Sequence, residues 1–98
     1  MKLLIRPAAA ADIEDGYRWY SEKRTQLGVQ FLAVVRAGFG RILETPEAYP
    51  VLHRETRRLR LKRFPYSLYY RVYPDTIVLV ACMHAKRDPR RWQGRLDG

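Results

Sequence analysis

Residues 57–92, RRLRLKRFPYSLYYRVYPDTIVLVACMHAKRDPRRW, decide the fold. They contain three segments with the patterns of β-strands. Residues 58–62 alternate strictly between basic and leucine side chains, which is the period-two pattern of a strand with one buried face. Residues 66–73 are rich in aromatic and β-branched side chains, and residues 76–83 are almost wholly apolar, as in a central strand. We therefore expect three consecutive strands joined by short, proline-containing turns.

The first half of the chain is expected to supply one strand and two helices. Residues 2–6 form a short apolar segment that ends at Pro7, whose missing N–H is harmless in a first helical turn. Residues 8–24, and then about 29–44, carry apolar side chains at helical spacing. Gly28 fits a cap or a short link between them. Because the link is short, the two helices should form an antiparallel hairpin.

The predicted order is β-α-α-β-β-β, an α+β fold in one domain spanning residues 1–98. We expect a small antiparallel sheet with the two-helix hairpin packed on one face and the first strand beside the last. Gly38 and Gly40 in the second helix predict close approach to the other helix or to the sheet. Residues 49–56 are expected to form a loop, and residues 85–98 a basic tail.

Charge is distributed unevenly along the chain. The net charge is +9, and residues 51–98 carry 12 basic against 4 acidic side chains, whereas residues 1–50 carry 7 against 6. Such a surplus predicts a polyanionic partner, either nucleic acid or an acidic protein. The alternative is a solvated basic face that binds nothing.

The cellular location is inferred from what the sequence lacks. The single cysteine, Cys82, excludes an internal disulfide and suits a buried thiol in a reducing compartment. We find no signal sequence and no apolar run long enough for a membrane span. A soluble cytoplasmic protein that does not contact the membrane is expected. No metal cluster and no cofactor motif are apparent.

The alternation predicts two faces for the second half of the chain. Leu59, Leu61, Leu68, Tyr70 and Val72 should point toward the helices. The opposite face should carry basic and aromatic side chains, joined by residues at the exit of the last strand. As candidate substrate-binding residues we take Arg58, Arg60, Lys62, Tyr69 and Lys86, and as candidate catalytic residues Arg71, His84 and Arg87.

Such a surface has the groups needed to bind and cut RNA. Arginines hold phosphates and stabilise a pentacoordinate phosphorane, tyrosine rings stack on bases, and a histidine transfers protons. Each of these residues also has a simpler, purely structural interpretation. The basic row would only keep an outer strand soluble, Arg71 would pair with an acid, and His84 would only end a strand. Trp92 is expected to be a hydrophobic pin for the tail.

Three segments carry a family resemblance, RFPY at 63–66, YRV at 70–72 and HAKRDP at 84–89. With the element order, they resemble RelE/ParE-type toxins of bacterial type II toxin–antitoxin modules, often labelled plasmid stabilisation proteins. The resemblance covers nearly the whole chain. It implies the β-α-α-β-β-β fold and an antitoxin partner whose acidic segment folds over the toxin. Promoter DNA would then be bound only indirectly, through the antitoxin.

The resemblance implies two alternative activities. RelE-like members are mRNA interferases that cut mRNA on the ribosome without a metal, using basic residues that match Arg60, Lys62, Arg71, His84 and Arg87 here. A tyrosine that some members place near the C-terminus has no clear counterpart in this chain. ParE-like members poison DNA gyrase and are not nucleases. The sequence leans toward the ribosome-dependent endonuclease, with a gyrase poison or an inactive module that only binds its antitoxin as alternatives.

Overall fold

Five strands form one mixed sheet in the computed structural model, which describes residues 1–96. Their order in the sheet is β1-β5-β4-β3-β2. β1 runs parallel to β5 and the other neighbouring pairs are antiparallel, so the sheet is mixed and not wholly antiparallel as expected. The predicted pairing of the first strand with the last is confirmed. The strands are β1 (Lys2–Ile5), β2 (Val51–His53), β3 (Thr56–Arg60), β4 (Tyr66–Val72) and β5 (Thr76–His84).

β2 lies in the segment that was expected to be a loop. It joins β3 through a two-residue turn in which Arg54 and Glu55 both have positive φ angles, 45° and 62°. Two positive φ angles are typical of the tight turns that match the twist of a hairpin. Neither residue is a glycine, so this turn lacks the residue type by which such turns are usually predicted.

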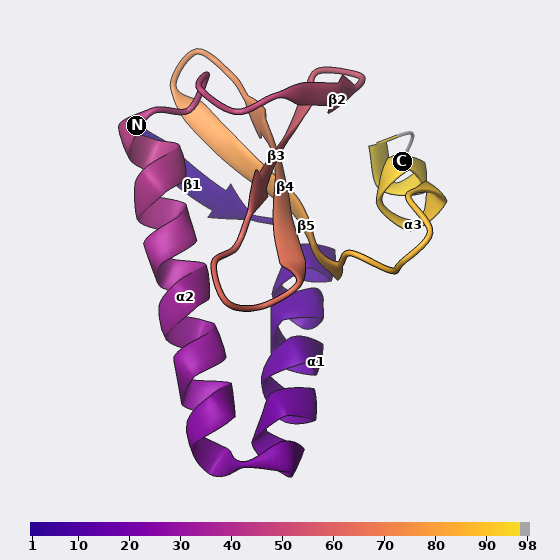
Figure 1. Ribbon diagram of the computed structural model, residues 1–98. Coiled ribbons are helices and arrows are strands. Elements are labelled where there is room, and N and C mark those ends of the chain that lie inside the picture. Colours follow the sequence, from indigo (N-terminus) through magenta and orange to yellow (C-terminus); the bar gives the residue numbers. More distant parts are fainter. Residues whose placement is uncertain (97–98) are drawn as a thin grey trace.

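Two helices form the predicted hairpin (Figure 1). α1 (Pro7–Lys23) begins with proline at its first position, and α2 (Thr25–Glu44) follows after the single residue Arg24. Gly28 is not a cap, because it lies inside α2 and is buried there. A Cβ at this position would lie 3.1 Å from the Tyr17 carbonyl oxygen of α1. The helices therefore cross closely at this point. No helix within residues 1–96 is long and apolar enough to cross a membrane.

The main core lies between this hairpin and the sheet. A Cβ added at Gly38 would come within 2.8 Å of Leu68 Cδ1, whereas one at Gly40 would meet nothing within 4 Å. The predicted close approach is therefore confirmed at Gly38 and wrong at Gly40. The fully buried side chains of this core include Ala9, Phe31, Ile42, Leu59, Leu68, Tyr70, Ile77 and Leu79.

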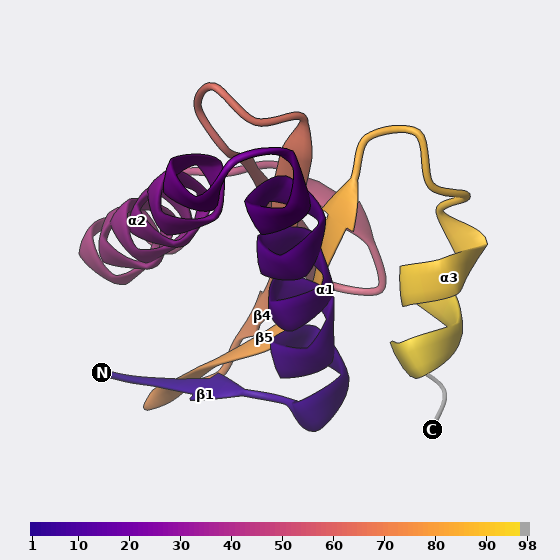
Figure 2. The same ribbon diagram turned by 90° about the horizontal axis from the view of Figure 1, so that it is seen from below.

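The opposite face of the sheet, called the outer face below, carries a second and smaller core. The segment expected to be a basic tail contains α3 (Arg90–Gln93) and the short 3-10 helix η1 (Gly94–Leu96). α3 lies apart from the hairpin (Figure 2). The C-terminal segment packs on the outer face through Trp92 and Leu96, which contact Tyr69, Val80, Ala81 and Met83.

A β-bulge changes which side chains of β5 face the helices. Tyr69 pairs with Ala81 and the next residue of β4, Tyr70, pairs with Leu79, so Val80 is an extra residue in β5. A bulge of this kind shifts the alternation of the strand that carries it. Val80 and Ala81 both contact the outer cluster, and Cys82 returns to the main core. His84, two residues on, therefore lies on the helix side.

Candidate functional site

The outer face carries the basic row that the alternation of β3 predicts. Arg58 pairs with Tyr69 across the strands and Arg60 pairs with Ser67. Directly paired residues of neighbouring strands point to the same face. Arg60 is exposed and Arg58 is half-buried, while Lys62 is exposed in the turn that follows β3. The structure therefore presents a short band of positive charge at this edge of the outer face.

Tyr69 is on the outer face but is covered. The Tyr69 ring stacks on the Trp92 ring, with 4.6 Å between the ring centroids and 23° between the ring planes. Tyr69 is only 7% exposed. Trp92 is 3% exposed and also meets the ring of His53 edge-on. The expectation that Tyr69 offers an open ring for base stacking is therefore wrong, because Trp92 already occupies that position. Trp92 has the geometry of the expected hydrophobic pin.

Arg71 also lies on the outer face, where it pairs with Thr56. Its Nε and Nη2 atoms donate hydrogen bonds to the Arg54 carbonyl oxygen at 3.0 and 2.6 Å. Among the described residues, Arg71 forms no ion pair with Glu55 or Asp75, the acids considered as its partners. This two-pronged contact holds the tight turn between β2 and β3, so Arg71 has a structural task in the folded chain.

His84 lies on the other side of the sheet from Arg71. It pairs with Tyr66, whose ring packs among Phe31 and Tyr20 of the helices, and the two rings of Tyr66 and His84 meet edge-on at 5.3 Å. The Lys86 N–H donates to His84 Nδ1 at 3.0 Å. An Nδ1 that accepts a hydrogen bond carries no proton, so the neutral ring in this arrangement carries its proton on Nε2.

A cavity of about 670 Å³ lies between α1, the end of β5 and the C-terminal segment. Its size falls within the range of small-ligand sites. Arg87 lines it, whereas Lys86 does not. The structure thus divides the candidate residues between the outer face and this cavity. The cavity brings together the side chains of Asp15, Trp19, Tyr66, His84, Arg87 and Arg91.

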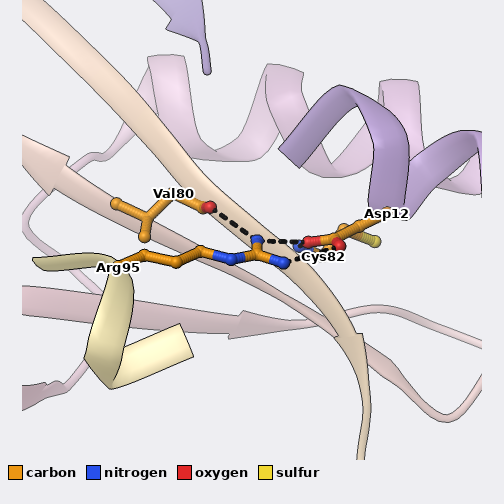
Figure 3. A network of polar contacts seen from close by, with 4 residues as sticks. All are labelled: Asp12, Val80, Cys82 and Arg95. Atoms are coloured by element: carbon orange, nitrogen blue, oxygen red, sulfur yellow. Dashed lines mark hydrogen bonds and ion pairs between the residues drawn. The ribbon is translucent and has the colours of Figure 1, made fainter. Parts of the chain in front are cut away.

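One ion pair ties the C-terminal segment to α1 beside this cavity (Figure 3). Arg95 donates to both carboxylate oxygens of Asp12, at 2.7 and 2.9 Å, and to the Val80 carbonyl oxygen at 3.1 Å. The Cys82 N–H donates to Asp12 Oδ2 at 3.0 Å. The hydrogen bonds from Arg95 to Asp12 raise the pKa of Arg95. Four groups from three distant parts of the chain are thereby joined.

Burial governs the chemistry of the thiol in this network. Burial, together with the nearby charge of Asp12, raises the pKa of the Cys82 thiol from 9.0 to about 12. A thiol held in this way stays protonated at neutral pH and is a poor nucleophile. Cys82 is a free thiol that is 2% exposed and belongs to the main core, as expected for a structural cysteine.

Sequence reasoning missed Asp12 and Arg95, although one signal was present. Asp12 stands between Ala9 and Gly16 on the buried side of α1, at spacings of three and four residues. A carboxylate on such a stripe needs a partner, because burying it unpaired is costly. The partner could not be named from the sequence, since Arg95 is one of many arginines in the C-terminal half.

A family model described as "ParE toxin of type II toxin-antitoxin system, parDE" matches residues 3–89. The chain belongs to the ParE toxin family. A solved structure described as "Chromosomal ParDE TA system from P. aeruginosa" shares the fold, with a TM-score of 0.65 and 22% identity over 86% of this chain and 95% of that chain. No curated protein matches the chain.

Membership of the ParE toxin family accounts for the fold and implies an antitoxin partner. The matched residues contain both helices of the hairpin, β1 without its first residue, the other four strands and His84, and they end at Pro89. Trp92 and Arg95 therefore lie beyond the part of the chain that the family model describes. Within residues 1–96, no cluster of three or more His, Cys, Asp or Glu side chains could hold a metal ion.

Proposed function

We propose that this ParE-family toxin arrests growth by binding DNA gyrase, and that it does not cut mRNA. The observation that carries the proposal is the separation of Arg71 and His84. One lies on the outer face with its guanidinium on the Arg54 carbonyl, and the other lies on the helix side against Tyr66. The family membership of the chain supports the same choice.

RNA cleavage without a metal needs several groups around one phosphate. A base must activate the 2′-hydroxyl, an acid must protonate the leaving oxygen, and positive charge must stabilise the transition state. In this arrangement Arg71 and His84 lie on opposite faces of the sheet, so the two side chains do not converge on one phosphate. Tyr69, two residues before Arg71 and on the same face, is buried under Trp92. A toxin that acts through binding needs no such convergence.

The charge of the chain fits the partners of such a toxin. The net charge of +9 would steer an acidic antitoxin segment to the basic half and speed its association. In this proposal the toxin works in the cytoplasm, where gyrase acts, and reaches promoter DNA only through the antitoxin. No cofactor is required for either partner.

Ribosome-dependent mRNA cleavage is a second candidate, favoured by one observation. Arg58, Arg60 and Lys62 form a band of positive charge on the outer face, and such bands bind phosphate backbones. If the chain were an interferase, Arg71 and these residues would hold RNA, and His84 or another group would have to move to complete the site.

The test is to induce the lone chain in cells and to label newly made protein and DNA separately. We expect DNA synthesis to fall first, with double-strand breaks and an SOS-type response, while translation continues. The variants Arg71→Ala and His84→Ala, checked for folding by thermal melting, should remain toxic. Early loss of translation, together with loss of toxicity in both variants, would favour the interferase. Harmless overexpression would identify an inactive interaction module.

A further inference from the structure

Two loops meet at one end of the sheet. Residues 61–65 join β3 to β4, and residues 85–89 follow β5. The Ala85 N–H donates to the Pro65 carbonyl oxygen at 2.8 Å, so the two loops lie side by side at the same end of the molecule (Figure 2). Four exposed basic side chains gather there. Together they are called the basic tip below, and they are Arg60, Lys62, Arg63 and Lys86.

The charges of the basic tip are not neutralised by neighbouring acids. Within residues 1–96, none of its four side chains forms an ion pair. Asp88 is the only acid in either loop, and it is already paired with the Arg90 guanidinium. Asp15 lines the cavity on the helix side together with Arg87, so Arg87 is not counted in the tip. The tip therefore offers four positive charges to a partner outside the chain.

Arg63 occupies a backbone position that arginine does not favour. Its φ angle is 70°, in the left-handed region that glycine adopts most easily. The side chain offsets little of this strain, because its hydrogen bond to the Gln30 side-chain oxygen is exposed and 3.4 Å long. Backbone strain that persists without a structural gain points to function. A basic side chain at this exposed position therefore indicates a task outside the fold.

The aromatic rings next to the tip are already occupied by contacts within the chain. Tyr69 is covered by Trp92, and Phe64 is buried in the main core. Tyr66 packs against Phe31 of α2. Proteins that bind single-stranded nucleic acid stack its bases on exposed rings. Positive charge without open rings instead suits the phosphates of a duplex, which are bound independently of base sequence.

We propose that the basic tip binds the phosphate backbone of duplex DNA, namely the segment that gyrase holds during cleavage. The toxin then contacts enzyme and DNA together, and two linked contacts hold a cleavage complex more tightly than either contact alone. The tip reads no bases, so it gives no preference for promoter DNA. The choice of gyrase-bound DNA rests on the proposed function, whereas the binding of duplex DNA by the tip does not.

The first test measures binding without gyrase. The purified whole chain is titrated onto a fluorescein-labelled DNA duplex of mixed sequence, and fluorescence anisotropy is recorded from about 50 to 200 mM salt. Four phosphate contacts predict a slope between about −3 and −4 when the logarithm of the binding constant is plotted against that of the salt concentration. Single-stranded RNA of the same length should bind more weakly. Absence of duplex binding at the lowest salt, or tighter binding of the RNA, would overturn the proposal.

Charge variants locate the contact. Arg60→Gln/Lys62→Gln should bind the duplex at least tenfold more weakly and lower the steepness of the salt dependence by about 2. The matched control, Lys2→Gln/Arg36→Gln, also removes one exposed lysine and one exposed arginine, and Lys2 lies at the opposite end of β5. It should bind within twofold of the unmodified chain. Equal losses in both variants, or an unchanged slope in the first, would contradict the assignment.

Arg63→Gly separates binding from stability. Glycine adopts the left-handed conformation without strain, so the variant should melt at a temperature no lower than the unmodified chain, yet bind the duplex at least threefold more weakly. A lower melting temperature with unchanged affinity would assign Arg63 to the fold and count against the proposal.

Failure of this inference and failure of the proposed function have different signatures. A chain that poisons gyrase but does not bind the duplex through the tip contradicts only this inference. A chain that binds the duplex through the tip but leaves gyrase unaffected contradicts the proposed function, and it leaves the DNA contact of the tip in place.

Discussion

Asp12 and Arg95 lie 83 positions apart in the sequence and meet in two hydrogen bonds of 2.7 and 2.9 Å. Their side chains are only 14% and 26% exposed, so solvent screens the pair less than a surface ion pair. The contact joins α1 to η1 and meets the unpaired edge of β5 at Val80 and Cys82. It therefore holds the C-terminal segment and completes the sheet at the same time.

Asp12→Ala should lower the free energy of unfolding by about 2–3 kcal/mol, because it leaves the Arg95 guanidinium and the Cys82 N–H without their acceptor. Urea unfolding measures the loss. Glu14→Ala, which removes an exposed pair with Arg18, is the matched control and should cost less than about 1 kcal/mol. In a double-mutant cycle with Arg95→Ala the two losses should be non-additive by about 1 kcal/mol or more. Strict additivity would contradict the pairing.

Gly38→Ala should destabilise the chain by about 1–2 kcal/mol, although alanine is the better helix former. The new methyl would lie 2.8 Å from Leu68 Cδ1 and 3.0 Å from Leu61 Cδ2, and Leu68 is fully buried. Gly40→Ala meets nothing within 4 Å and should stabilise the same helix by up to about 1 kcal/mol. Thermal melting of both variants checks the opposite signs. Two shifts of the same sign would refute the close approach at Gly38.

Trp92→Ala should cost about 3 kcal/mol, because it uncovers Tyr69 and empties the centre of the outer cluster. Limited proteolysis should then cut residues 85–96 faster. Trp19→Ala removes a tryptophan that is 53% exposed and should cost much less. If cleavage of the C-terminal segment proves as slow in Trp92→Ala as in the unmodified chain, Trp92 does not pin that segment.

Alkaline pH should weaken the fold. Burial raises the pKa of Cys82 from 9.0 to about 12, and burial also raises the pKa of Tyr70 from 10.0 to about 12. Below about pH 9 both groups are protonated in the folded and in the unfolded chain, so their titration does not change the free energy of unfolding with pH. Between about pH 9 and 12 the unfolded chain loses these protons first, and stability falls. Melting temperatures from pH 8 to 11 measure the decline, which should be shallower in Cys82→Ala.

The strands of the second half were readable from the sequence because each has one dominant physical signal. Leu59 alternates with basic residues, which is the pattern of a strand with one buried face. The apolar run of β5 predicts a central strand, because both faces of such a strand must be covered. The element order predicted that the first strand would lie beside the last, and the pairing of β1 with β5 confirms this. The main core was predictable for the same reason, because the apolar residues at helical spacing and at strand spacing are the ones that form it.

The arrangement of the candidate site was not readable in the same way. A bulge at Val80 leaves no mark in an apolar run, yet it moves His84 to the helix side. Trp92 reaches Tyr69 only because a short helix turns the C-terminal segment back onto the sheet. Both effects depend on contacts between distant residues, and alternation within one strand cannot report them.

The most direct test of the proposed function is a cleavage assay with purified gyrase, supercoiled plasmid and the purified chain. We predict that linear DNA accumulates when the chain is added, and that Arg71→Ala and His84→Ala act as strongly as the unmodified chain. In parallel, translating ribosomes with the same chain should show no new cuts in mRNA. Intact plasmid together with mRNA cut on the ribosome would contradict the proposal.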